Sequence, residues 1–178
     1  VGGARVHGQQ LAGHERPAGD LDALDLDRVV VGAQLDVVAD AVGKQARVDT
    51  LETDAEIVFQ MDADLSHDPK YVPDMVRATA SYDVVIGSRY LQGVSVVNWP
   101  LRRLMLSTFA NWYVRTITGM RVRDCTAGFR CWRRQAIARI PLDTITSDGY
   151  SFQVETLFLA LDAGCTVGEV PIIFVERT

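Results

Sequence analysis

Two carboxylates stand two residues apart where an apolar stretch of the chain ends. Ala55 to Met61 is mostly apolar and bounded by charge, which predicts a buried strand, and Asp62 and Asp64 follow it. Residues i and i+2 of extended chain share one side, so both carboxylates can converge on one cation. Such oxygen ligands suit Mg²⁺ or Mn²⁺ with a phosphate-bearing substrate, and open α/β sheets bind ligands at strand carboxyl ends. A solvated acidic turn is the alternative.

An EF-hand calcium loop is excluded, although Asp62, Asp64 and Ser66 match its first three ligand positions. That loop requires Gly at its sixth position and Glu at its twelfth, where this chain has His67 and Pro73. We interpret His67 as the residue before the next helix rather than as a partner of the carboxylates.

A basic residue follows the second predicted strand, which spans 83–86. Arg89 comes directly after Gly87 and Ser88, so its guanidinium is expected at the same sheet edge as Asp64. A guanidinium there can clamp a phosphate in bidentate fashion. A surface arginine in a turn is the alternative.

A polar stripe runs along a predicted helix. Arg103, Ser107 and Asn111 fall at i, i+4 and i+8, which places a cation, a hydroxyl and an amide in line. Such a stripe can hold a phosphate head group, and a solvated helix face explains it equally well. Further along, small residues in the loop 124–130 would let backbone N–H groups approach a ligand closely, unless the loop is an ordinary turn.

The elements that must position these residues alternate between strand and helix, which favours an α/β sheet. Asp68-Pro69 is a helix start, and the helix runs toward Ala80. Pro100 opens a long helix that Gly119 closes, Ser151 caps another, and 166–175 is a final strand. In the long helix we expect a core face, with Trp112 and Tyr113 as core aromatics. Its apolar positions are Leu101, Leu104, Met105, Phe109, Trp112 and Thr116.

Composition restricts the class of protein. The 178 residues suffice for one domain, and the net charge of −5 argues against a generic nucleic-acid binder. Cys125, Cys131 and Cys165 show no CxxC spacing, so reduced thiols in a cytosolic setting are expected rather than zinc or disulfides. No apolar run reaches membrane-spanning length, so we expect any membrane contact to be peripheral.

Six blocks of residues, in order over 55–178, closely resemble the dolichol- or polyprenol-phosphate mannosyltransferases of glycosyltransferase family 2. The resemblance implies a GT-A fold, a Rossmann-like nucleotide-diphospho-sugar transferase sheet with flanking helices. The blocks are Asp62-Ala63-Asp64-Leu65-Ser66-His67-Asp68-Pro69, Gly87-Ser88-Arg89-Tyr90, Asn98-Trp99-Pro100 with Arg102, Arg103 and Ser107, Asp124-x-Thr126-Ala127-Gly128-Phe129-Arg130, Ser147-x-Gly149-Tyr150-x-Phe152-Gln153-x-Glu155 and Val170-Pro171-Ile172-x-Phe174-x-x-Arg177.

The resemblance also implies an activity: transfer of mannose from GDP-mannose to a polyprenyl (dolichyl) monophosphate, with Mg²⁺ or Mn²⁺ bridging the diphosphate. In-line attack by the acceptor phosphate would invert the sugar and needs no protein nucleophile. The location implied is cytoplasmic, peripheral at the cytoplasmic face of the membrane, and the sequence leaves room for a protein partner that anchors the enzyme there.

The resemblance assigns roles to individual residues. It gives catalytic roles to Asp64, Arg89 and Arg103, and metal-binding roles to Asp62, Asp64 and Ser66. The substrate-binding residues that it implies are Asp62, Arg89, Arg103, Ser107, Thr126, Gly128, Gln153 and Arg177.

Residues 1–54 depart from the family pattern and form an atypical N-terminal segment. They contain neither the PTYNE-like nor the DDGSxD-like motif with which the family opens and which holds the nucleotide base and ribose. Our hypothesis for this segment, based on its composition, is translation of a GC-rich gene in an unrelated frame, with the family sequence resuming near Ala55. A family 2 enzyme that uses another sugar nucleotide, such as UDP-glucose, and an inactive remnant are therefore the alternatives.

Overall fold

The computed structural model describes residues 29–34, 55–62 and 66–176 of the chain. Five strands form one mixed sheet: β1 (Val29–Gln34), β2 (Ile57–Asp62), β5 (Arg130–Arg133), β3 (Val84–Ser88) and β6 (Val167–Pro171), in that spatial order. β1 is parallel to β2 and β3 to β6, whereas β5 runs antiparallel between β2 and β3. Two short parallel strands, β4 (Val96–Val97) and β7 (Phe174–Val175), form a separate sheet.

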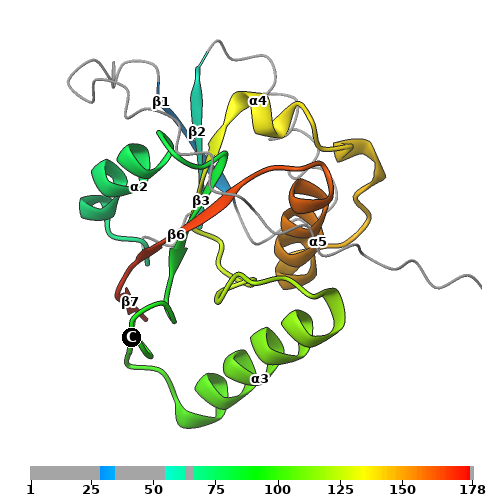
Figure 1. Ribbon diagram of the computed structural model, residues 1–178. Helices are drawn as coiled ribbons and strands as arrows, with labels where there is room; N and C mark the ends of the chain where they lie inside the picture. Colours follow the sequence, from blue (N-terminus) through cyan, green and yellow to red (C-terminus); the bar gives the residue numbers. More distant parts are fainter. Residues whose placement is uncertain (1–28, 35–54, 63–65, 177–178) are drawn as a thin grey trace, which may run out of the picture.

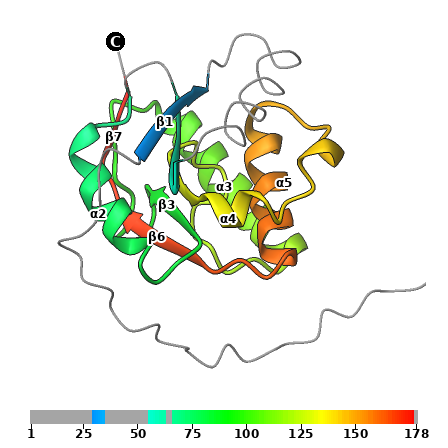
Figure 2. The same cartoon turned by 90° about the horizontal axis from the view of Figure 1, so that it is seen from above.

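Helices flank the sheet on both faces (Figures 1 and 2). The 3₁₀ turn η3 (Pro69–Tyr71) leads into α2 (Val72–Ala78), while α4 (Arg134–Ile137), the 3₁₀ turn η4 (Leu142–Thr144) and α5 (Gly149–Asp162) follow β5. Phe59 packs with Met75 of α2, and its neighbour Val58 packs with Ala160 of α5. The alternation of buried side chains along β2 therefore forms a core on each face of the sheet.

Several local predictions are confirmed. Asp68 accepts a hydrogen bond from the backbone N–H of Lys70, as a helix cap does, and Gly119 ends α3 (Leu101–Thr118) in the left-handed conformation. The predicted cap at Ser151 is wrong, because α5 begins at Gly149 with Asp148 as its N-cap and Ser151 lies inside the helix. The predicted strand 166–175 divides into β6 and β7, which belong to different sheets.

The predicted core face of α3 is wrong. Most of the side chains predicted for that face, and the neighbouring Tyr113, are exposed: Leu101 is 70% exposed, Phe109 58% and Trp112 59%. The one buried residue of the helix is Asn111, from the polar stripe. α3 lies apart from the main sheet in Figure 1. Its polar side faces the protein because Asn111 forms hydrogen bonds with Thr126 and with the Cys125 backbone there.

Candidate active site

One cavity of about 320 Å³ collects most of the residues that the sequence singled out. Its walls come from the ends of β2 and β3, the loop after Asp124, the N-terminus of α5, the first turns of α3, and β7. The predicted site residues that line it are Asp62, Arg89, Arg103, Thr126, Gly128 and Gln153. Ser66 is buried but is not among the residues that line the cavity. Asp64 and Arg177 lie outside the described residues.

Asp62 forms the acidic corner of the cavity. Its carboxylate lies against Gly128, where a Cβ atom would stand only 2.8 Å from Oδ1 of Asp62, so this close approach requires glycine. His67 holds the other side: its Nδ1 accepts a hydrogen bond from the Asp62 backbone N–H at 3.4 Å, and its Nε2 is 3.8 Å from Oδ2 of Asp62. The interpretation of His67 as only a residue before a helix is therefore wrong, since it lines the cavity beside the carboxylate.

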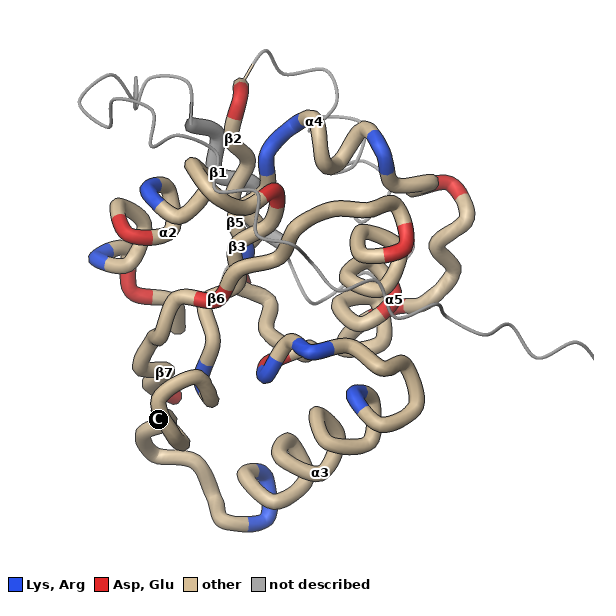
Figure 3. The backbone as a smooth tube through the Cα atoms, viewed as in Figure 1, with Lys and Arg blue, Asp and Glu red and all other residues tan. Residues whose placement is uncertain are grey.

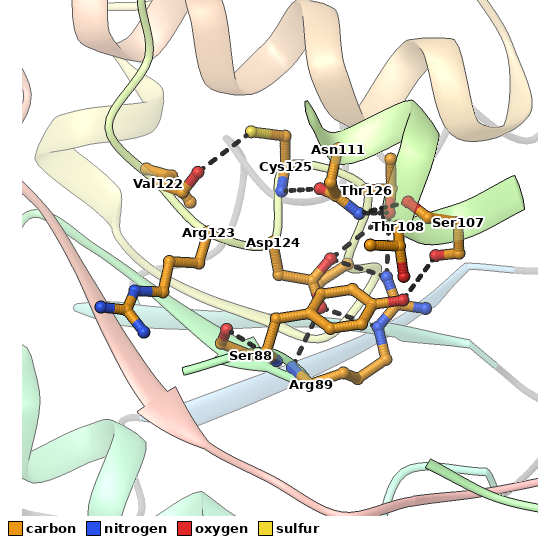
Figure 4. Close-up of polar contacts among 12 residues, drawn as sticks. Ser88, Arg89, Ser107, Thr108, Asn111, Val122, Arg123, Asp124, Cys125 and Thr126 are labelled. Carbon is orange, nitrogen blue, oxygen red and sulfur yellow. Dashed lines mark hydrogen bonds and ion pairs between the residues drawn. The ribbon is translucent and has the colours of Figure 1, made fainter. Parts of the chain in front are cut away.

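Arg89 is buried and bound to Asp124. Its Nε and Nη2 donate to the two carboxylate oxygens of Asp124 at 2.7 Å each, and Nη2 also donates to Thr126 at 2.9 Å (Figure 4). Burial alone would lower the pKa of Arg89, but hydrogen bonds and charge from Asp124 outweigh it and raise this pKa. The fork of Arg89 is thus used on a protein carboxylate, and its contact with an acceptor phosphate stays a prediction.

Asn111 connects α3 to this buried pair. Its amide donates to Thr126 Oγ1 at 3.2 Å and accepts from the backbone N–H of Cys125 at 2.7 Å (Figure 4). One turn earlier, Ser107 accepts a hydrogen bond from the Tyr90 hydroxyl at 2.7 Å. Asn111 and Ser107 therefore fix the inward side of the helix to the wall of the cavity.

Arg103 completes the stripe at the cavity itself. Its guanidinium forms an ion pair with Glu176 and lies over the Trp99 ring, 4.4 Å from the ring centre. The Arg89 guanidinium lies 5.4 Å from the centre of the same ring, so one indole contacts both arginines. Trp99 and Glu176 were not singled out from the sequence as site residues. Trp99 belongs to the Asn98-Trp99-Pro100 motif, and Glu176 directly precedes Arg177 of the last motif.

The acidic corner has the chemistry of a hard-cation site. Among the described residues no group of three acidic, histidine or cysteine side chains could hold a metal ion, so Asp62 contributes one carboxylate there. Carboxylate and hydroxyl oxygens are nevertheless the donors that Mg²⁺ and Mn²⁺ prefer, and the Asp62 carboxylate lines the cavity with Gly128 directly against it. The arrangement can hold two anions, one near Asp62 through a cation and one near Arg103.

The sequence itself shows which family the chain belongs to. Residues 50–146 match the sequence profile described as glycosyl transferase family 2, which is more than half of the chain. The chain belongs to glycosyl transferase family 2.

Two curated members of this family share extended similarity. The undecaprenyl-phosphate mannosyltransferase of Micrococcus luteus is 42% identical over 127 residues, covering 71% of this chain and 52% of that protein. The polyprenol monophosphomannose synthase of Mycolicibacterium smegmatis is 44% identical over 122 residues, covering 68% and 46%. The chain thus spans about half the length of these relatives.

Solved structures support the fold. The glucosyl-3-phosphoglycerate synthase of Mycobacterium tuberculosis with phosphoglyceric acid matches at a TM-score of 0.54 and 18% identity, covering 79% of this chain and 49% of that one. Its complex with Mn²⁺, uridine diphosphate and phosphoglyceric acid matches at 0.54 and 16% identity, covering 76% and 46%. At such identities the likeness shows the fold alone, and it confirms the predicted GT-A arrangement.

Proposed function

We propose that the protein transfers mannose from GDP-mannose to a polyprenyl monophosphate, inverting the sugar, with Mg²⁺ or Mn²⁺. The observation that carries this proposal is that one cavity is lined both by Asp62 with Gly128 and by Arg103 with Arg89. The names of the two relatives, an undecaprenyl-phosphate mannosyltransferase and a polyprenol monophosphomannose synthase, support the choice of sugar and acceptor.

The chemistry requires cationic groups rather than a nucleophilic side chain. A phosphate monoester has a second pKa of about 6, so the acceptor oxygen is already anionic near neutral pH. It must approach a nucleoside diphosphate, and the two repel each other unless positive charge stands between them. Arg103 supplies that charge at the acceptor, and the N-terminus of α5, where Gly149 and Tyr150 line the cavity, adds the positive end of a helix dipole.

The donor is assigned to the part of the cavity that Asp62 lines. Asp62, with Asp64, would hold the divalent cation, which neutralises the departing diphosphate when bound. His67 accepts a hydrogen bond from the Asp62 backbone N–H and has its Nε2 3.8 Å from the carboxylate, while Gly128 leaves room for that carboxylate. Arg89 acts through its pair with Asp124 to fix the wall between the two substrates.

Contact with a membrane surface is part of the proposal. A polyprenyl chain resides in the bilayer, and the outward side of α3 presents apolar side chains to solvent. Among the described residues no helix is long and apolar enough to cross a membrane. The exposed apolar residues of α3 are Leu101, Met105, Leu106, Phe109, Trp112, Tyr113 and Ile117.

The first test is calorimetric titration of GDP, with and without Mn²⁺, followed by transfer of radiolabelled mannose to a short polyprenyl phosphate. We expect GDP binding that depends on Mn²⁺, and loss of that dependence in Asp62→Ala. Tighter binding of UDP than of GDP would instead indicate another sugar nucleotide. Absence of any nucleotide binding would mean that the chain carries no donor site.

A further inference from the structure

A second, apolar hollow lies between α3 and α5. It has a volume of about 390 Å³. Two rows of side chains spaced by one helical turn face it, Ala110, Val114 and Thr118 from α3 and Tyr150, Val154 and Phe158 from α5. The first and last residues of each row are eight positions apart, which is roughly 12 Å of helix at 1.5 Å per residue. We call this hollow the α3–α5 groove.

The α3–α5 groove adjoins the cavity of the candidate active site. Thr126 and Tyr150 line both. The hydroxyl of Thr126 accepts hydrogen bonds from Arg89 and Asn111, so its polar atom belongs to the network beside the cavity. A polar site for an anion and an apolar groove thus share a wall.

Among the described residues that line the groove, Glu155 alone is charged, and its carboxylate is hydrogen-bonded to Ser147. Its Oε2 accepts hydrogen bonds from the Ser147 hydroxyl and from the Ser147 backbone N–H at 3.2 Å. A carboxylate with these partners does not require a cation in the groove. The walls therefore favour an uncharged, flexible apolar chain.

We propose that the α3–α5 groove binds the first isoprene units of the acceptor, next to its phosphate. This inference rests on the proposed function, because it assumes that the acceptor phosphate occupies the cavity. A polyprenyl phosphate has one anionic end joined to an apolar chain, and cavity and groove offer these two environments in the same order. Along α3, the groove residues Val114 and Thr118 alternate with Tyr113 and Ile117 of the outward face, so a chain leaving the groove meets the side assigned to the membrane.

The test compares two phosphates that differ only in their chain. Methyl phosphate and farnesyl phosphate, the latter below its micellar concentration, are titrated into the full chain by calorimetry. Burial of the prenyl chain predicts at least tenfold tighter binding of farnesyl phosphate, because each buried methylene contributes about 0.8 kcal/mol. Equal affinities would overturn the groove while leaving the phosphate site intact. Failure of both compounds to bind would instead refute the acceptor site of the proposed function.

A variant that fills the groove provides the second arm. Ala110→Trp is expected to abolish the advantage of farnesyl phosphate and to leave methyl phosphate unchanged. Ile117→Trp adds comparable bulk on the exposed side of the same helix, at a side chain that is 68% exposed, and is expected to change neither affinity. Retention of the full farnesyl advantage in Ala110→Trp would overturn the proposal.

Photolabelling removes dependence on the folding of the variant. Farnesyl phosphate with a diazirine at its chain end, applied to the unmodified chain, is expected to label peptides 110–118 or 150–158. Labelling confined to other segments would overturn the proposal. Sedimentation provides a further check. A dimer that is dissociated by Ala110→Trp but not by farnesyl phosphate would also overturn the proposal, because a second copy of the chain would then occupy the groove.

Discussion

Arg89 and Asp124 form a buried ion pair beside the cavity. Arg89 is 6% exposed and Asp124 fully buried, and the two make paired hydrogen bonds that few surface ion pairs match. Asp124 also accepts a hydrogen bond from the Arg89 backbone N–H at 3.0 Å. Side chain and backbone are thus fixed by one carboxylate, which makes this pair a support for the cavity wall.

Removal of that carboxylate's charge is expected to be costly. Asp124→Asn leaves Arg89 buried with a neutral partner, and breaking a buried pair in this way costs about 3–5 kcal/mol of unfolding free energy. Asp74→Asn is the matched control, because it removes the charge from an exposed pair with Arg77 and should cost less than about 1 kcal/mol. Urea unfolding of both variants measures the difference, and equal effects would contradict the structural role of Asp124.

Glu176 forms an ion pair with Arg103, the arginine that we assign to the acceptor phosphate. Glu176→Gln removes the competing charge, so methyl phosphate is expected to bind more tightly. A partly exposed pair contributes up to about 1 kcal/mol, which corresponds to roughly fivefold in affinity. Calorimetry measures this change, and Arg103→Gln should change affinity in the opposite direction. Weaker binding by Glu176→Gln would show that Glu176 orients Arg103 instead of competing for it.

The position of single residues at the cavity was predictable where a sequence motif marks them, whereas their roles stay predictions and their distant partners were not predictable. Asp62 and Arg103 were assigned from the sequence and line the cavity. The pairing of Arg89 with Asp124 joins residues 35 positions apart, and only the fold brings them together. His67 was assigned to the helix start, because the sequence does not show that its ring turns back to Asp62.

At the scale of elements, α3 separates what helical periodicity predicts from what it leaves open. Spacing correctly grouped Arg103, Ser107 and Asn111 on one side and Phe109 and Trp112 elsewhere. It does not say which side faces inward, and the usual preference for buried apolar residues gave the wrong answer. Hydrogen-bond partners at Thr126 and Cys125 decide the orientation, and they come from another part of the chain. The glycine that ends α3 depends on local backbone conformation alone, which is why Gly119 was predictable, whereas the predicted start of α5 at Ser151 was wrong.

The starts of β3 and β6 are joined by a buried carboxylate. Asp83 accepts hydrogen bonds from the backbone N–H and hydroxyl of Thr166 at 2.9 and 3.0 Å and pairs with Arg139 at 3.0 Å. Burial acts to raise the pKa of Asp83, but these contacts outweigh it and hold the pKa below the ordinary value of an aspartate. The charged form therefore stabilises the fold at pH values above the unfolded pKa, and this contribution is lost as the pH falls through the lower folded pKa.

Asp83→Asn tests this coupling. At pH 7 the variant should lose about 2 kcal/mol of unfolding free energy, the order of magnitude for hydrogen bonds to a charged group. The gap between wild type and variant should narrow as the pH falls below about 4. Urea unfolding across this range measures the gap, with exposed Asp143→Asn as the control that changes little at either end. A gap that stays constant with pH would contradict the assignment.

In the whole molecule, the cavity, the α3–α5 groove and the exposed face of α3 lie next to one another in that spatial order. The sheet edge holds the cavity, α3 and α5 enclose the groove beside it, and the outward side of α3 carries the exposed apolar residues. α3 contains three arginines and no acidic residue, with basic residues toward both of its ends (Figure 3). The overall charge of −5 conceals this local excess of positive charge. The order of the five strands was not predictable, because the insertion of antiparallel β5 depends on long-range pairing.

The orientation of α3 and its contact with a bilayer are tested by one double variant, Phe109→Ser with Trp112→Ser. If these side chains enter the membrane interface, losing both lowers vesicle binding more than tenfold, since each apolar side chain contributes about 1.5–3 kcal/mol when buried. Unfolding free energy should change by less than about 1 kcal/mol, whereas two core truncations would cost several. Cosedimentation with anionic vesicles measures the binding, and Val94→Ser, exposed and outside α3, is the control. Unchanged vesicle binding would refute the membrane contact, and a large loss of stability would show that another surface covers this face.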